Sequence, residues 1–251
     1  ALQCNGDLSI ADGMNGWAST VSGGDSYSKY DPKNLESYQW IAFGISSKTG
    51  RSVTVVGVTM YQGDYLPVNA TKTQEDMPSG GYAYFDGYYL ILDNFTYEGK
   101  GYIYNTKNYG IISDYSLNII LAGRNSITIS DDSDDGVCEG IRSGRNIHIS
   151  GDGTLNIKSD ISLITGHGGI YIDNTTVNTV GTANYYNVTT FERNIEITDS
   201  TVTIDSLGGG LQCYDEKLDI YITGSHVTID VNAECIVSKR DDVEGCLFVQ
   251  D

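Results

Sequence analysis

The sequence predicts an all-β protein: a right-handed parallel β-helix (solenoid) preceded by a mostly β N-terminal cap. From about residue 90 onward a pair of short apolar strands recurs roughly every 25 residues, and a fixed period of this length is typical of stacked repeats. Each strand alternates apolar and polar side chains, as half-buried strands do. Gly, Asp, Asn and Ser separate the strands, and these residues favour tight turns.

Each repeat contains three apolar elements. The first strands are expected to begin near Ile119, Ile147, Ile170, Ile195 and Ile220. The second strands are expected to begin near Ile127, Leu155, Val177, Val202 and Val227. A third element is expected at residues 110–113, 140–143, 163–165, 211–213 and 236–238. Three strands in about 25 residues fit one turn of a parallel β-helix, so residues 81–251 should form about six to seven rungs.

A column of turn residues supports this alignment. The residues expected just before the first strands are Asn118, Asn146, Gly169, Asn194 and Asp219. Asn side chains at equivalent turns can form a ladder of hydrogen bonds along a stack. We therefore expect a structural role for this column.

Residues 1–80 lack the repeat and are expected to form the cap. Asp31-Pro32 has the pattern of an N-cap and first helical residue, which predicts a short helix through about Trp40. Strands are expected over 39–45 and 51–61. The cap should cover the first rung, because the open end of a β-helix is an exposed edge that invites aggregation.

Composition restricts the partners. The formal net charge is −18, which disfavours nucleic acid and anionic membrane surfaces, since both need basic surfaces. No stretch reaches the ~20 apolar residues that span a bilayer. No signal peptide is visible, so an exported protein would be represented by a mature or truncated chain. None of the five cysteines has CxxC spacing, which argues against a zinc site.

Tyrosines are concentrated between residues 82 and 109. Tyrosine combines a flat apolar face with a hydroxyl, which suits sugar stacking as well as ordinary packing. One interpretation is a carbohydrate-binding platform, and the other is aromatic packing of the cap and early rungs. The candidate carbohydrate-binding residues are Tyr82, Tyr84, Tyr88, Tyr89, Tyr102 and Tyr104.

The densest acidic run lies at residues 130–136, in a loop after a second strand. Closely spaced carboxylates bind calcium through their oxygens, although the order does not match an EF-hand loop because it lacks the Glu at the twelfth position. A solvated acidic loop is the alternative. The candidate metal ligands are Asp131, Asp132, Asp134 and Asp135, with calcium as the expected cofactor.

The sequence contains no motif of a known catalytic site. The GxSxG, HExxH and Gly-rich phosphate-loop patterns are absent, and the three histidines occupy different positions in the repeat. Arg142, Arg145 and Arg193 could lie on one face near acidic loops. The short loops between strands predict a flat or shallow surface, which suits binding better than enclosing a transition state.

The strand and turn motifs resemble a known family. The matching segments run through residues 55–58, 88–94, 110–113 and 117–127, with themes such as Gly110-Ile111-Ile112-Ser113. They resemble β-helical surface proteins of gut and cellulolytic Firmicutes that are commonly labelled carbohydrate-binding domain-containing. The resemblance covers about residues 55–230. It implies a right-handed parallel β-helix, export to the cell surface, and binding of acidic plant polysaccharides with calcium.

Together these observations predict an exported bacterial protein, secreted or on the cell surface, that binds polysaccharide or a surface glycan without catalysis. An exposed strand face with tyrosines would make the contact. Two alternatives stay open. One is a polysaccharide lyase or glycoside hydrolase of the pectin-degrading β-helix type, which needs clustered carboxylates. The other is an adhesin-like or structural surface protein with a protein partner.

Overall fold

A computed structural model describes residues 15–19, 28–29, 40–44, 51–131, 136–214, 218–240, 243–244 and 247–250. The chain divides into two compact units, Ala1–Ser52 and Val53–Asp251. In the first unit, β1 (Asn15–Ser19) pairs antiparallel with β2 (Ser28–Lys29) and β3 (Trp40–Gly44) to form sheet A. The helix expected from Asp31 falls outside the described residues, except for Trp40, which begins β3.

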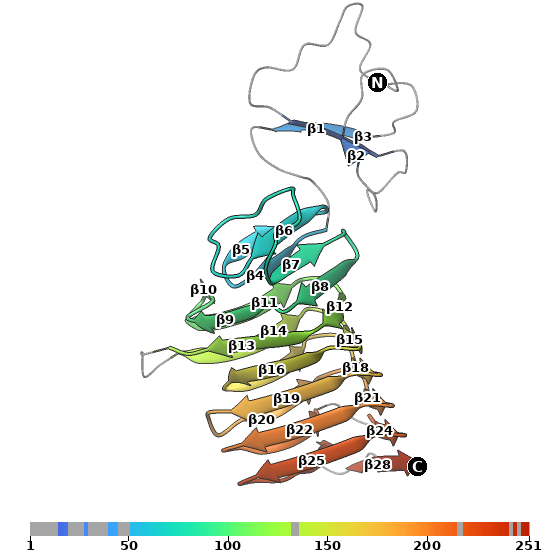
Figure 1. The fold of residues 1–251 in the computed structure, drawn as a ribbon. Helices are drawn as coiled ribbons and strands as arrows, with labels where there is room; N and C mark the ends of the chain where they lie inside the picture. Colours follow the sequence, from blue (N-terminus) through green and yellow to red (C-terminus); the bar gives the residue numbers. More distant parts are fainter. Residues whose placement is uncertain are drawn as a thin grey trace, which may run out of the picture. The chain divides into compact units, whose positions relative to one another are not determined.

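The second unit is a parallel β-solenoid built from three sheets, which confirms the predicted fold class (Figure 1). Sheet D contains six parallel strands, β9 (Thr96–Gly99), β13 (Arg124–Ile129), β16 (Thr154–Ser159), β19 (Thr176–Gly181), β22 (Thr201–Ser206) and β25 (His226–Val231). The parallel strands of sheet C are β8 (Tyr89–Asp93), β12 (Leu117–Ala122), β15 (Ile147–Gly151), β18 (Ile170–Asp173), β21 (Ile195–Thr198), β24 (Ile220–Thr223) and β28 (Leu247–Gln250). Those of sheet B are β11 (Lys107–Ser113), β14 (Val137–Ser143), β17 (Ile161–Thr165), β20 (Tyr186–Thr190), β23 (Gly209–Cys213) and β26 (Ile236–Arg240).

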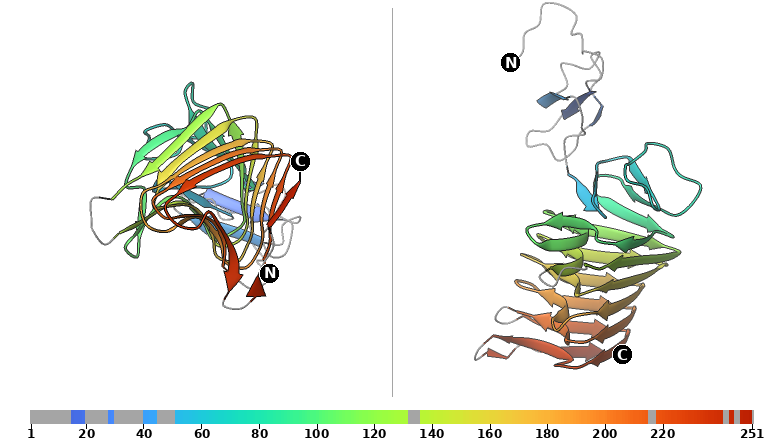
Figure 2. Two further views of the ribbon diagram at one scale, coloured as in Figure 1. Left: turned by 90° about the horizontal axis from the view of Figure 1, so that it is seen from below. Right: turned by 90° about the vertical axis from the view of Figure 1, so that its left-hand side faces the viewer.

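In every turn the chain visits sheet B, then sheet C, then sheet D. The three sheets surround the interior of this unit, as the view along the stack shows (Figure 2, left). Among the described residues there is no helix, and so none that is long and apolar enough to cross a membrane.

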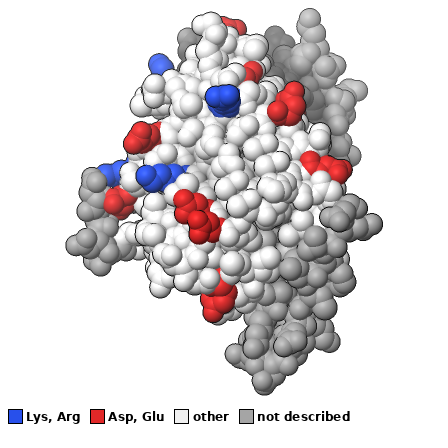
Figure 3. All heavy atoms as spheres, turned by 60° about the horizontal axis from the view of Figure 1, so that its bottom comes forward, with Lys and Arg blue, Asp and Glu red and all other residues white. Residues whose placement is uncertain are grey.

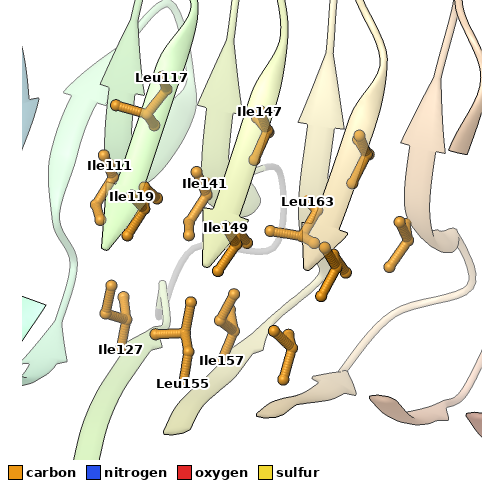
Figure 4. Packing of buried hydrophobic residues seen from close by; sticks show 14 of the residues in the cluster. Ile111, Leu117, Ile119, Ile127, Ile141, Ile147, Ile149, Leu155, Ile157 and Leu163 are labelled. Carbon is orange, nitrogen blue, oxygen red and sulfur yellow. The ribbon is translucent and has the colours of Figure 1, made fainter. Parts of the chain in front are cut away.

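Columns of aliphatic side chains fill the solenoid interior (Figure 4). Strand register aligns Ile111 with Ile141 and Ile141 with Leu163 in sheet B. In sheet C it aligns Ile119 with Ile149. These side chains are essentially buried. Successive residues of a strand point to opposite faces, so every second side chain points into the interior and packs against its counterparts in the neighbouring rungs.

Antiparallel strands close the first turn of the solenoid. Strands β4 (Val53–Val55) and β5 (Val58–Met60) form a hairpin whose first strand pairs with β11. Strands β6 (Asp64–Pro67) and β7 (Tyr82–Phe85) pair with each other and then with β8. The single strand expected over 51–61 is therefore wrong. Val56 and Gly57 both have positive φ, 45° and 92°, and two such residues make the tight turn that reverses the chain.

The alignment of the first repeat differs by two residues from the prediction. Ile147 pairs with Leu117 rather than Ile119, and Leu155 pairs with Asn125 rather than Ile127. Asn118 is therefore not a member of the turn column, because it lies within β12 and pairs with His148. The column itself is present, since Asn146 and Asn194 accept hydrogen bonds from the Gly169 and Asp219 N–H groups, at 3.0 Å each.

The prediction also missed one strand of sheet B, β20. Val188 is its inward residue, in register with Leu163 and Leu211. Its neighbours Asn187 and Thr190 are polar but fully buried. The Thr190 hydroxyl donates to the Arg193 carbonyl and to the Gly168 carbonyl, the latter at 3.1 Å, so it holds the end of this strand both to its own following turn and to the turn of the preceding rung.

Candidate functional site

The outer face of sheet C carries most of the candidate residues. Its strands alternate buried and outward side chains, and the register arranges the outward ones in columns along the stack. One column contains Tyr89, Asn118, His148, Tyr171, Glu196 and Tyr221. A second contains Tyr65, Tyr84, Ile91, Ile120, Ser150, Asp173, Thr198 and Thr223. Since rungs are about 4.8 Å apart, each column offers side chains at short, regular intervals.

Three tyrosines form an aromatic cluster where sheet C begins, which we call the Tyr65 cluster (Tyr65, Tyr82 and Tyr84). The Tyr65 and Tyr84 rings stack with centroids 4.3 Å apart, and Tyr82 meets Tyr65 edge to face at 5.3 Å. Burial raises the pKa of Tyr82 and Tyr84, and the charge of Asp93 raises that of Tyr82 further. The hydroxyls therefore stay protonated. The structure thus joins two predicted tyrosines to Tyr65, which the sequence prediction left out.

Tyr88 and Tyr89 follow the hairpin turn between β7 and β8, and Tyr89 is the first residue of β8 in sheet C. Their rings meet edge to face at 4.9 Å, and the residues are 54% and 40% exposed. The Asp86 carboxylate accepts hydrogen bonds from the backbone N–H groups of Tyr88 and Tyr89, at 2.7 and 2.6 Å. This turn therefore holds two accessible rings in fixed positions beside the outward column of sheet C.

Tyr102 and Tyr104 lie elsewhere. They belong to β10 (Tyr102–Tyr104), which pairs antiparallel with β11 at sheet B. Their rings are nearly parallel, with an interplanar angle of 6° and centroids 6.3 Å apart. The predicted tyrosine platform is therefore divided between two sheets, and only its first four members lie on sheet C.

His148 and Tyr171 form an aromatic pair in the middle of the sheet C face. Their rings meet edge to face at 4.9 Å. His148 points outward between two buried isoleucines, as the alternation predicts. Burial raises the Tyr171 pKa and the Glu196 carboxylate raises it further, whereas the Arg193 charge lowers it. The charges of an acidic and a basic group therefore act on the Tyr171 hydroxyl in opposite directions.

A pocket of about 260 Å³ lies beside Tyr171, where the turns from sheet B to sheet C stack. We call it the arginine pocket, and its lining residues are Ser116, Arg145, Asn146, His167, Tyr171 and Arg193. A Cβ on Gly168 would lie 2.3 Å from the Arg145 carbonyl carbon. The missing side chain therefore lets the His167 turn lie directly against the Arg145 turn, which brings the basic groups together.

Arg142 does not share this pocket, although the sequence suggested that it could lie beside Arg145 and Arg193. It bonds to Glu139 at 2.9 Å, and Lys107 binds the other carboxylate oxygen at 2.6 Å. The Glu139 side chain is completely buried. The sequence alone does not reveal this ion network, because only the register of β11 and β14 places Lys107 close to Glu139.

Of the four predicted calcium ligands, the structure describes only Asp131. Asp132, Asp134 and Asp135 lie outside the described residues. Asp131 is described, and its carboxylate lies 3.4 Å from the Lys100 ammonium group. Within the described ranges, no group of three or more His, Cys, Asp or Glu side chains could hold a metal ion. On the face shown in Figure 3, acidic side chains lie in separate small groups with basic ones between them.

Comparisons of this chain with protein-family models, with curated proteins and with solved structures found no match.

Proposed function

We propose that this chain is a non-catalytic glycan-binding protein whose binding surface is the outer face of sheet C. The observation that carries the proposal is the set of outward aromatic side chains on that face: the Tyr65 cluster in one column, and Tyr89 and the His148–Tyr171 pair in the neighbouring column, where Asn118 lies between them. Flat rings with polar edges stack on the apolar faces of sugars while their hydroxyls exchange hydrogen bonds. Regular spacing along the stack suits an extended polymer better than a single small molecule.

Carboxylates beside the rings support the same proposal. Asp93 raises the pKa of Tyr82 from the neighbouring strand, and the Tyr221 hydroxyl donates to the Asp219 carboxylate at 2.9 Å. Such oxygens accept hydrogen bonds from sugar hydroxyls. A non-catalytic role is favoured because Glu139, the carboxylate with two cationic partners, has a fully buried side chain that a substrate could not reach.

Export to a bacterial surface is part of the proposal and is supported by the family resemblance of residues 55–230. Calcium is the expected bridging ion between acidic loops and an acidic glycan. Direct contact by arginine is the competing mode of anion recognition. A binding assay in calcium and in chelator separates these two modes.

The test is a binding screen of the purified chain against immobilised neutral and acidic polysaccharides, with calcium and with chelator in parallel. We expect Tyr89→Ala to weaken binding by about twofold to tenfold, as expected for the loss of one aromatic contact. The matched control is Tyr104→Ala, which removes an exposed ring from sheet B. Equal losses from the two variants, or binding to no polysaccharide, would contradict the proposal.

A second candidate, docking of a protein partner, is favoured by the exposed apolar residues of the β10 strand. Ile103 and Tyr104 are 60% and 55% exposed, and as consecutive strand residues they leave an apolar side chain on each side of the β10–β11 hairpin. If no polysaccharide binds, cross-linking through this hairpin on intact cells is the next experiment.

A further inference from the structure

The arginine pocket gathers positive charge in a strongly acidic protein. The formal net charge of the chain, with histidine neutral, is −18, yet Arg145 and Arg193 line one pocket together with His167, which is paired with the Glu192 carboxylate. They come from three successive turns between sheets B and C, after β14, β17 and β20. Arg145 and Arg193 are two rungs apart, about 10 Å along the stack, and two arginine side chains can bridge that span.

The two arginines have no acidic partner within the described part of the chain. Arg142 and Lys107 bind Glu139, and His167 binds Glu192 at 2.6 Å, but no carboxylate lies within ion-pair distance of Arg145 or Arg193. Like charges that face one pocket repel each other, and a bound anion would relieve that repulsion. The pocket therefore has the charge to receive an anionic group.

The remaining lining residues fit a sugar that carries the anion. The Tyr171 ring packs edge to face against His148, so its orientation is fixed. The Asn146 amide is also fixed, because its oxygen accepts the Gly169 N–H. Guanidinium groups bind carboxylates through paired, planar hydrogen bonds. An aromatic ring, a fixed amide and two guanidinium groups together match one acidic sugar residue within a longer chain.

We propose that the arginine pocket is a subsite for the carboxylate of a hexuronic acid residue, which Arg145 and Arg193 bind directly without calcium. This inference rests on the proposed glycan binding at sheet C and adds its chemical specificity. The neutral part of the polymer would lie along the aromatic column, which reaches the pocket at Tyr171.

The test uses two probes, an oligomer of a hexuronic acid and the same oligomer reduced at its carboxyl groups to the neutral hexose. Binding is measured in chelator and in calcium, for the full chain and for Arg145→Gln and Arg193→Gln. We expect the full chain to prefer the acidic oligomer by about tenfold to a hundredfold, the range for charge-assisted hydrogen bonds. Each variant should lose most of that preference.

The matched control is Arg124→Gln, which removes the same charge at the start of β13 in sheet D. It should keep the preference, and thermal melting of all variants checks that each is folded. Equal affinity of the full chain for both oligomers would overturn the carboxylate subsite and leave glycan binding intact. Preference that needs calcium, or that survives both arginine substitutions, would also overturn it. Binding of neither oligomer would contradict the proposed function as well.

Discussion

Gly224 shows how one residue can depend on the neighbouring rung. It has a φ of +57°, and a Cβ on it would lie 2.3 Å from the Asp199 carboxylate oxygen. Asn174 and Asp199 occupy the same turn in the two preceding rungs, with φ of 48° and 46°. Left-handed conformation is tolerated by Asn and Asp and is free of strain only for glycine. The sequence predicted these turns correctly, because the residue types that favour them are few.

Gly224→Ala should therefore destabilise the protein by at least about 1 kcal/mol, through left-handed strain and contact with Asp199. The control is Gly80→Ala, because a Cβ at Gly80 meets nothing within 4 Å. Urea unfolding curves of the two variants give the comparison. Equal stability of the two variants would show that the turn tolerates a side chain.

Of the three cysteines in the described part of the chain, two face the solenoid interior and one faces solvent. Cys138 and Cys213 are buried, whereas Cys235 is exposed. Burial raises the pKa of the Cys138 thiol to about 11 and that of Cys213 to about 12. Because the thiolate is the reactive form, on the order of one Cys213 thiol in ten thousand is ionised at pH 8.

Alkylation at pH 8 should consequently label Cys235 in the folded protein, whereas Cys138 and Cys213 should react only after unfolding. Peptide mass spectrometry assigns the label to each cysteine. Rapid labelling of Cys213 in the folded protein would contradict its placement inside the solenoid.

At the scale of elements, the strand faces could be predicted but the register of the first repeat could not. Alternation with a period of two fixes which residues point inward, and it is unchanged by a shift of two residues. Leu117, Ile119 and Leu121 are all apolar, so each could begin the column. Asn125 made the register of the second strand harder to predict, because it is a fully buried polar residue at the position that Leu155 and Val177 occupy in later rungs.

Hydrogen bonds explain why Asn125 can occupy an apolar column. Its side-chain oxygen accepts the Phe95 N–H at 2.8 Å, and its nitrogen donates to the Ala122 and Thr154 carbonyls. Asn125→Leu would complete the apolar column but leave these groups without partners. We expect it to lower the free energy of unfolding by about 1–3 kcal/mol.

The control for this prediction is Ser126→Ala, which changes an outward residue of the same strand and should alter stability by less than about 0.5 kcal/mol. Chemical denaturation of both variants provides the measurement. A more stable Asn125→Leu variant would mean that apolar burial outweighs the three hydrogen bonds at this position.

At the scale of the whole molecule, the repeat predicted the solenoid but not its candidate site. The arginine pocket joins turns of different length, since Ile147 follows Ser143 by four residues whereas Ile195 follows Thr190 by five. Only the observed register aligns Arg145, His167 and Arg193. Likewise, the tyrosine-rich segment is continuous in sequence, yet β10 turns onto sheet B and separates Tyr104 from Tyr84. The six predicted tyrosines are close in sequence, but they do not form one carbohydrate-binding platform, because Tyr102 and Tyr104 lie at sheet B.

The outer face of sheet C is the proposed glycan-binding surface. Hydroxyl-radical footprinting of the full chain with a hexuronic acid oligomer, read out by peptide mass spectrometry, shows which tyrosines the oligomer covers. We expect the bound oligomer to reduce oxidation of Tyr84, Tyr89 and Tyr171, and to leave Tyr104 on β10 unchanged. Protection of Tyr104 without protection of the sheet C tyrosines would contradict this proposal.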